Sequence, residues 1–185
     1  MSQSNQALTA DLSLVLCTYG RVNEVNEFLK SIHAQTTKPA EIIIVDQNEK
    51  EILNDSINEW QSKLSITHKR VNFKGASKSR NYGAREARTS LIAFPDDDCV
   101  YPSRLVEEIA KLFQTNPRVD VILTSKIEPS EIYDGLKQAT PYHSRVSTIL
   151  DLFKAKAETS NIFTRKSTLK SLSSVFDDTI GPGAN

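Results

Sequence analysis

Three consecutive aspartates, Asp96, Asp97 and Asp98, form the group of residues in this chain with the clearest chemical potential. Adjacent carboxylates repel one another, so a fold gathers them only where a cation or solvent compensates their charge. Their oxygens are the preferred ligands of Mg²⁺ and Mn²⁺, which proteins often bind together with substrate phosphates. A solvated turn that caps a helix beginning near Ser103 is the alternative. The triplet follows a buried strand and precedes Pro102 and a helix, which favours the metal hypothesis.

Two further polar groups follow predicted strands. Thr18, Tyr19 and Arg21 come at the end of one apolar run, and Asp46 ends another. Open α/β sheets bind ligands beyond the carboxyl ends of their strands, so parallel strands would bring these side chains and the aspartates to one edge. There Asp46 could accept hydrogen bonds from a base or a ribose. Each of these residues could equally well just end a strand or begin a turn.

The segment 74–85 places Gly75 and two serines before a basic helix. Helix N-termini attract phosphate through unpaired N–H groups and the helix dipole, and Arg80 adds a planar group that suits a phosphate or a base edge. The spacing matches neither the Walker nor the dinucleotide-binding glycine pattern. Lysines and arginines on a surface helix are also most often just solvated.

The cysteines and histidines add no further catalytic pattern. Cys17 and Cys99 give neither a disulfide framework nor a set of zinc ligands, and we expect Cys17 to be a small core residue. His33, His68 and His143 lack the spacing of a metal site or of a Ser–His–Asp triad, and we expect His33 at the surface.

These candidate residues must be positioned by strands and helices that alternate along the chain. Short apolar runs predict strands at residues 12–19, 41–46, 65–71, 90–94, 119–125 and 161–164. Apolar residues at helical spacing predict helices at residues 22–32, 53–64, 75–88 and 105–113. Such alternation predicts an α/β fold in which helices cover both faces of a mostly parallel central sheet. Less regular patterns predict an irregular stretch at 127–147, weak helix at 149–156 and a loop at 176–185.

Composition places the chain among ordinary globular domains. Its 185 residues are 38% hydrophobic and 25% charged, and 23 basic residues balance 23 acidic ones, so no net charge draws it to nucleic acid. No apolar run is long enough to cross a bilayer, although a peripheral membrane contact stays open. Residues 1–11 form a polar leader without the features of a signal peptide. We therefore expect one domain, residues 12–185, in the cytoplasm.

Taken together, these features resemble family 2 glycosyltransferases, whose nucleotide-sugar-binding domain has the GT-A fold. The resemblance is carried by residues 14–21, 43–46, 75–83 and 94–98, in this order, and it covers nearly the whole chain from residue 12 onwards. It implies a GT-A, Rossmann-like sheet. It also implies transfer of a sugar from a nucleotide-diphosphate sugar to a hydroxyl group of a saccharide or lipid-linked acceptor, in polysaccharide or glycolipid assembly.

The resemblance also implies roles for individual residues. Thr18, Tyr19 and Asp46 would line the nucleobase and the ribose, and Arg80 would lie near the base or the diphosphate. The residues expected to bind the nucleotide are Thr18, Tyr19, Arg21, Asp46, Arg80 and Asp96.

The aspartates correspond to the Asp-x-Asp signature of the family, which touches the ribose and binds a Mn²⁺ or Mg²⁺ ion that bridges the diphosphate. Spacing makes Asp96 and Asp98 the pair. Distance to Pro102 instead puts Pro95 in the first acidic position and makes Asp97 the metal ligand. All three aspartates are therefore candidate metal ligands.

Inverting members of the family take the acceptor proton with an aspartate late in the domain. Here the chain stops at residues 181–185, and the resemblance places that motif further downstream. Asp177 and Asp178 match the loop before it, so we assign no catalytic base and expect the domain to be incomplete at its C-terminal end. A metal-dependent inverting glycosyltransferase is the first hypothesis. A truncated, non-catalytic nucleotide-sugar-binding or remnant domain is the alternative.

Overall fold

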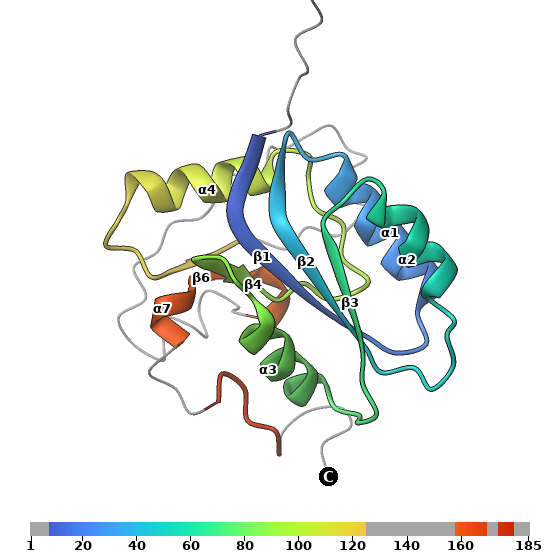
Figure 1. Ribbon diagram of the computed structural model, residues 1–185. Coiled ribbons are helices and arrows are strands. Elements are labelled where there is room, and N and C mark those ends of the chain that lie inside the picture. Colours follow the sequence, from blue (N-terminus) through green and yellow to red (C-terminus); the bar gives the residue numbers. More distant parts are fainter. Residues whose placement is uncertain (1–7, 125–157, 170–173, 180–185) are drawn as a thin grey trace, which may run out of the picture.

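The computed structural model describes residues 8–124, 158–169 and 174–179 (Figure 1). Six strands form one sheet in the order β3-β2-β1-β4-β6-β5. The strands are β1 (Leu8–Thr18), β2 (Thr37–Asp46), β3 (Ile66–Arg70), β4 (Leu91–Ala93), β5 (Val121–Leu123) and β6 (Ile162–Arg165). The helices are α1 (Val22–His33), α2 (Asn54–Gln61), α3 (Ala76–Glu86), α4 (Leu105–Thr115), the 3-10 turn η1 (Thr159–Asn161) and α7 (Lys166–Leu169).

The centre of the sheet is parallel. β1 lies between β2 and β4 and runs parallel to both, and β3 extends the parallel part beyond β2. Strands in a parallel sheet are covered on both faces, so their apolar residues follow one another without alternation. In β1, Leu14 and Leu16 are fully buried on one face and Val15 is fully buried on the other. The strands predicted at residues 12–19 and 41–46 are thus confirmed.

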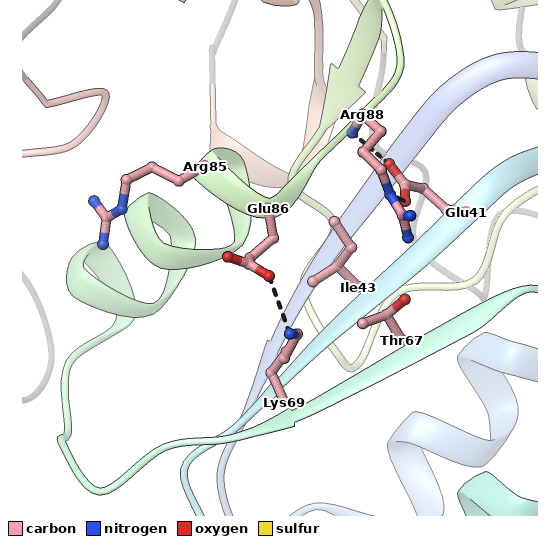
Figure 2. A pocket seen from close by; sticks show the side chains of 7 residues that line it. All are labelled: Glu41, Ile43, Thr67, Lys69, Arg85, Glu86 and Arg88. Carbon is pink, nitrogen blue, oxygen red and sulfur yellow. Dashed lines mark hydrogen bonds and ion pairs between the residues drawn. The ribbon is translucent and has the colours of Figure 1, made fainter.

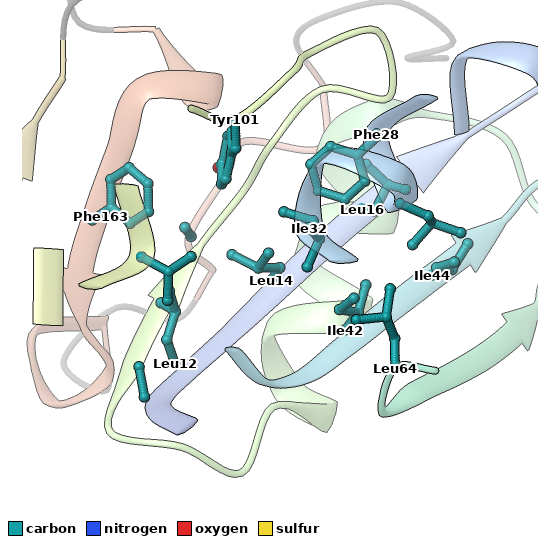
Figure 3. Packing of buried hydrophobic residues seen from close by; sticks show 14 of the residues in the cluster. Leu12, Leu14, Leu16, Phe28, Ile32, Ile42, Ile44, Leu64, Tyr101 and Phe163 are labelled. Atoms are coloured by element: carbon teal, nitrogen blue, oxygen red, sulfur yellow. The ribbon is translucent and has the colours of Figure 1, made fainter. Parts of the chain in front are cut away.

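Helices cover both faces of this sheet, as predicted. On one face, buried side chains of α1, α2 and α4 pack on β1 and β2, and Figure 3 shows Phe28 and Ile32 of α1 beside Leu14 and Ile42 of the strands. The ring of Tyr101 meets Phe28 edge-on at 5.6 Å between ring centroids. On the other face, α3 packs its small residues against a second apolar cluster.

The first strand starts earlier than the apolar pattern predicts. β1 begins at Leu8, and its first residues pair with Thr37, Lys38 and Pro39 of β2 before an irregularity in the register. Part of the predicted polar leader therefore belongs to the sheet. Backbone pairing needs no buried side chain, and Leu8 is 73% exposed, so hydrophobic periodicity cannot detect this extension.

The far side of the sheet departs from simple strand–helix alternation. That alternation predicts that the strand near residues 119–125 continues the parallel sheet, but β5 lies at the edge and pairs only with β6 among the described residues. The late strand β6 inserts between β4 and β5 and is antiparallel to both. The sheet is thus mixed, with a parallel centre. The stretches predicted at 127–147 and 149–156 lie outside the described residues.

The helices are short. The longest among the described residues, α1, has 12 residues, whereas a membrane span needs about 20. No helix in the described part of the chain is long and apolar enough to cross a membrane.

α3 approaches the sheet most closely at Gly83. A Cβ atom at this position would overlap Cγ1 of Val15 and lie 3.2 Å from Cγ2 of Val45. Glycine inside a helix costs about 1 kcal/mol relative to alanine, so helix propensity alone would favour alanine here. The close contact between α3 and the two central strands explains why glycine is present.

We predict that Gly83→Ala destabilises the protein by about 1–3 kcal/mol, because overpacking outweighs the gain in helix propensity. The midpoint of thermal unfolding, measured by circular dichroism, should fall by roughly 3–10 °C. Val15→Ala removes the overlapping methyl group, so the double variant should lose less stability than the two single variants together. An unchanged or higher midpoint in Gly83→Ala would contradict this close approach.

Candidate functional site

The parallel strands bring the predicted site residues to one edge of the sheet. Thr18 at the end of β1 and Asp46 at the end of β2 are register partners, and the aspartate triplet follows β4. A cavity of about 340 Å³ lies at this edge. Its lining residues are Cys17, Thr18, Tyr19, Arg21, Gln47, Ala76, Arg80, Asp96, Asp97 and Asp98. The structure therefore places all the predicted site residues except Asp46 in the wall of one cavity.

Two arginines compensate the charge of the three aspartates. Nη1 of Arg21 donates hydrogen bonds to Asp97 Oδ1 at 3.0 Å and to Asp98 Oδ2 at 2.6 Å. Nη2 of Arg80 donates to Asp96 Oδ1 at 2.8 Å. The guanidinium groups thus supply part of the compensation that adjacent carboxylates require. Because each arginine sits beside its carboxylates in an open cavity, the same groups can also bind an incoming cation and an incoming anion.

The three carboxylates differ in environment. The side chain of Asp97 is 10% exposed, whereas that of Asp98 is 54% exposed. Burial raises the pKa of Asp97 above its usual range, although the Thr18 hydroxyl and the Arg21 guanidinium favour its charged form. Asp97 is therefore the carboxylate of the triplet with the highest cost of being charged in the fold.

Asp96 and Asp98 point their oxygens toward the same place as the sulfur of Cys99. The three ligand atoms lie within 4.8 Å of one another. Carboxylate oxygens suit hard ions such as Mg²⁺ and Mn²⁺, whereas a thiolate prefers softer metals. The donor set fits a divalent cation held by two carboxylates, with other ligands supplied by water or substrate. Among the described residues, these atoms are the one such convergent group of acidic, histidine or cysteine side chains.

The N-terminus of α3 also opens on the cavity. Gly75 has a φ of 120°, a conformation that favours glycine, and its N–H donates to Gln47 Oε1 at 2.8 Å. Gly75 is the N-cap residue and has no side chain that could cap the first turn. Ala76 in that turn lines the cavity. An 11-residue helix thus directs the positive end of its dipole at the site, beside Arg80.

Asp46 lies behind this wall. Its side chain is fully buried and accepts hydrogen bonds from the backbone N–H of Asn48 at 2.8 Å and from Asn48 Nδ2 at 2.7 Å. His68 Nε2 of the neighbouring strand lies 3.0 Å from its other oxygen. Asn48 Oδ1 in turn accepts from the N–H of Gly20, in the turn after β1, at 2.7 Å. Asp46 therefore links the loops after β1 and β2 with strand β3, and its direct contact with a nucleotide stays a prediction.

Two contacts at this edge, His68 with Asp46 and Lys74 with Tyr19, cannot be read from the sequence. Its spacing in the sequence predicts no metal site or triad for His68, and it meets Asp46 because β3 pairs with β2. Lys74 places Nζ 3.9 Å from the ring centroid of Tyr19, whose side chain is largely exposed.

Cys17 packs on the core as predicted but also lines the cavity. Burial raises the pKa of its thiol to about 12, which makes it a poor nucleophile. His33 is exposed, as predicted.

A second cavity lies near the other end of α3 (Figure 2). Its volume is about 350 Å³, and its lining residues are Glu41, Ile43, Thr67, Lys69, Arg85, Glu86 and Arg88. Four of its charged side chains form ion pairs: Lys69 Nζ lies 3.0 Å from Glu86 Oε2, and Arg88 Nε lies 3.4 Å from Glu41 Oε2. The side chain of Arg85 points away from both pairs. None of the predicted site residues is in this cavity. The cavity at the carboxyl edge is therefore the candidate functional site.

Comparison with known proteins agrees with this arrangement. The family model described as glycosyl transferase family 2 matches residues 13–174. The chain belongs to this family. A glycosyltransferase of Haemophilus influenzae, itself uncharacterised, is 31% identical over 139 residues, which cover 65% of this chain and 46% of the relative. The glucosyl-dolichyl phosphate glucuronosyltransferase of Haloferax volcanii is 31% identical over 111 residues, 57% of this chain and 35% of that protein.

Solved structures of proteins that bind nucleotide sugars share the fold. Staphylococcus aureus TarS 1–349 in complex with UDP-GlcNAc superposes with a TM-score of 0.68 at 17% identity, covering 86% of this chain and 46% of TarS 1–349. The mannosyltransferase PcManGT of Pyrobaculum calidifontis, in complex with GDP-Man and Mn²⁺, gives a TM-score of 0.67 at 17% identity, over 95% of this chain and 50% of that one. The predicted GT-A fold is thus confirmed. This family 2 chain spans half or less of the length of these proteins.

We predict that, in Asp46→Asn, the stability of this family 2 domain changes less with pH in the acidic range than it does in the wild type. Burial alone would raise the pKa of Asp46, but the hydrogen bonds from His68 and Asn48 lower it below its usual value of 3.8. A lowered pKa stabilises the fold above about pH 4, and this contribution disappears as pH falls through the folded-state pKa.

Asp46→Asn should therefore lower the unfolding midpoint at pH 7 by roughly 3–10 °C, the equivalent of about 1–3 kcal/mol. The difference from the wild type should shrink when both are measured near pH 3. Asp120→Asn, which changes an exposed aspartate, is the matched control and should have little effect at either pH. A difference between wild type and Asp46→Asn that is equal at both pH values would count against the charged Asp46 anchor.

Proposed function

We propose that this chain is the donor-binding part of a metal-dependent glycosyltransferase and binds a nucleotide-diphosphate sugar at the carboxyl edge of the sheet. The observation that carries the proposal is the composition of the 340 Å³ cavity. It combines two guanidinium groups and a helix N-terminus, which suit a diphosphate, with carboxylates that suit a divalent cation. Membership of glycosyl transferase family 2 supports the same assignment.

The diphosphate group would lie between Arg80 and the first turn of α3. Arg80 is largely buried and reaches the cavity from that helix, so its guanidinium and the backbone N–H groups approach a ligand from the same side. Charge-assisted hydrogen bonds from a planar guanidinium match phosphate oxygens well. Arg21 would become available to the same anion once a cation takes Asp98 from it.

Asp96 and Asp98 would hold a Mn²⁺ or Mg²⁺ ion, supported by the convergence of their oxygens; Asp97 is the alternative ligand, and its burial makes it the less suitable one. When bound, the cation offsets negative charge that develops on the departing nucleoside diphosphate. The charges of a divalent cation and of a diphosphate group cancel, so both can enter together without changing the net charge of the cavity. The presence of Mn²⁺ with GDP-Man in PcManGT supports this pairing.

The other residues of this edge support the binding of a nucleoside but do not indicate which base it carries. Thr18 and the exposed ring of Tyr19 lie where a nucleoside would extend from the diphosphate, and Asp46 supports that edge from behind. TarS binds UDP-GlcNAc and PcManGT binds GDP-Man, so the fold accepts more than one base. The name of the Haloferax volcanii relative supports a lipid-linked saccharide as the acceptor class. Inversion at the anomeric carbon would need a general base, which we do not assign to a described residue.

We predict that one of UDP, GDP, CDP and TDP raises the midpoint of thermal unfolding in the presence of Mn²⁺ and raises it less without the metal. A ligand at about 100 times its dissociation constant adds roughly 2.7 kcal/mol of stability. For a domain of this size the midpoint should rise by roughly 5–10 °C. The absence of any shift with all four nucleotides would contradict a donor site.

Single variants then test the metal ligands. Asp98→Asn should abolish the Mn²⁺-dependent part of the shift, measured from the variant's own midpoint without ligand, whereas Asp120→Asn should keep it. Loss of the shift in Asp97→Asn together with its retention in Asp98→Asn would transfer the metal to Asp97. Release of nucleoside diphosphate from the matching nucleotide sugar separates an enzyme from a domain that only binds the donor.

A further inference from the structure

Asn81 occupies an unusual place for its residue type. It lies in the middle of α3 directly after Arg80, and it is only 4% exposed. Asparagine is a poor helix former, and a buried amide is costly unless its donors and acceptor are satisfied. The sequence patterns assign no role to this residue, but its hydrogen bonds in the structure indicate one.

The Asn81 side chain binds a segment that follows it by more than 90 positions in the chain. Its Oδ1 accepts hydrogen bonds from the backbone N–H of Val175 at 3.1 Å and of Phe176 at 2.9 Å. Its Nδ2 lies 2.8 Å from Ser174 Oγ and from the Phe176 carbonyl oxygen and 2.6 Å from Asp178 Oδ1, three acceptors that share its two N–H groups. One side chain thus satisfies both backbone and side-chain groups of residues 174–178 and fixes this segment against α3.

The docked segment in turn contacts Arg80 through Phe176. The Phe176 ring packs edge-on against Phe94, with 4.9 Å between ring centroids and an interplanar angle of 86°. The Arg80 Cζ atom lies 5.8 Å from the centroid of the same ring. The guanidinium therefore contacts both the ring of Phe176 and the carboxylate of Asp96, and its buried Nε has no hydrogen-bond partner among the described residues.

We propose that Asn81 is a positioning residue for donor binding. By docking residues 174–178 on α3, it places Phe176 against Arg80 and holds the guanidinium in the orientation that the donor diphosphate requires. A free arginine side chain loses rotamer entropy when it binds a ligand, and one that is already fixed does not incur this loss again. The inference rests on the proposed function, because it concerns the affinity of the same cavity.

The test compares three variants with the wild type. Asn81→Ala removes the anchor, Phe176→Leu keeps the anchor but removes the aromatic ring, and Asn58→Ala changes an exposed asparagine of α2 as the matched control. The probe is the nucleoside diphosphate that gives the largest thermal shift with Mn²⁺, titrated by calorimetry well below the unfolding midpoints. We expect binding about tenfold weaker in Asn81→Ala and in Phe176→Leu, the equivalent of one lost hydrogen bond, and unchanged binding in Asn58→Ala.

Hydrogen exchange separates positioning from a general loss of structure. The amides of Val175 and Phe176 should exchange faster in Asn81→Ala, while the amides of α3 stay protected. In Phe176→Leu, both the amides of residues 175 and 176 and those of α3 should stay protected. If Asn81→Ala does not fold, the affinity of Phe176→Leu alone tests the proposal. Equal affinity in wild type and variants would overturn this inference alone. Absence of nucleotide binding to the wild type would overturn the proposed function and this inference with it.

Discussion

The repulsion among Asp96, Asp97 and Asp98 is the constraint on which the rest of the site depends. Three adjacent carboxylates at the end of a buried strand are unfavourable unless positive charge lies close to them. The fold supplies it from two directions, because Arg21 comes from the turn after β1 and Arg80 comes from α3. Both elements must be held firmly against the central strands. The same arrangement leaves a cavity, and we propose that a cation and an anion replace the internal pairs there.

The position of Arg80 depends on how α3 packs. Gly83 lets the helix lie directly on Val15 and Val45, while the left-handed conformation of Gly75 begins the helix at the cavity. Asn81 then binds residues 174–178 on the outer side of α3. The glycine at position 83 thus lets α3 lie close to the sheet, and the amide of Asn81 holds residues 174–178 against the helix. Three positions spread over nine residues therefore determine where one guanidinium lies.

Much of this architecture follows from local sequence patterns, because the information is local. Apolar runs such as residues 41–46 specify strands that are buried on both faces, and the alternation with helices specifies a parallel sheet. The insertion of β6 between β4 and β5 has no such local cause, because it depends on pairing between distant segments. The same holds for the contact of His68 with Asp46. A buried asparagine in a helix is a sign of an unusual contact, but its partner cannot be read from neighbouring residues.

Asp46 and Asp97 show why residue type alone does not assign roles at this edge. Both are buried aspartates near the carboxyl ends of central strands, yet hydrogen bonds from His68 and Asn48 lower the pKa of Asp46, whereas burial raises that of Asp97. Asp46 is therefore a charged anchor for the surrounding loops. Asp97 is charged only at a cost, which its pairing with Arg21 reduces. Asp96 and Asp98 are more exposed than Asp97, and their oxygens lie within 4.8 Å of one another, which is why we propose them as the metal ligands.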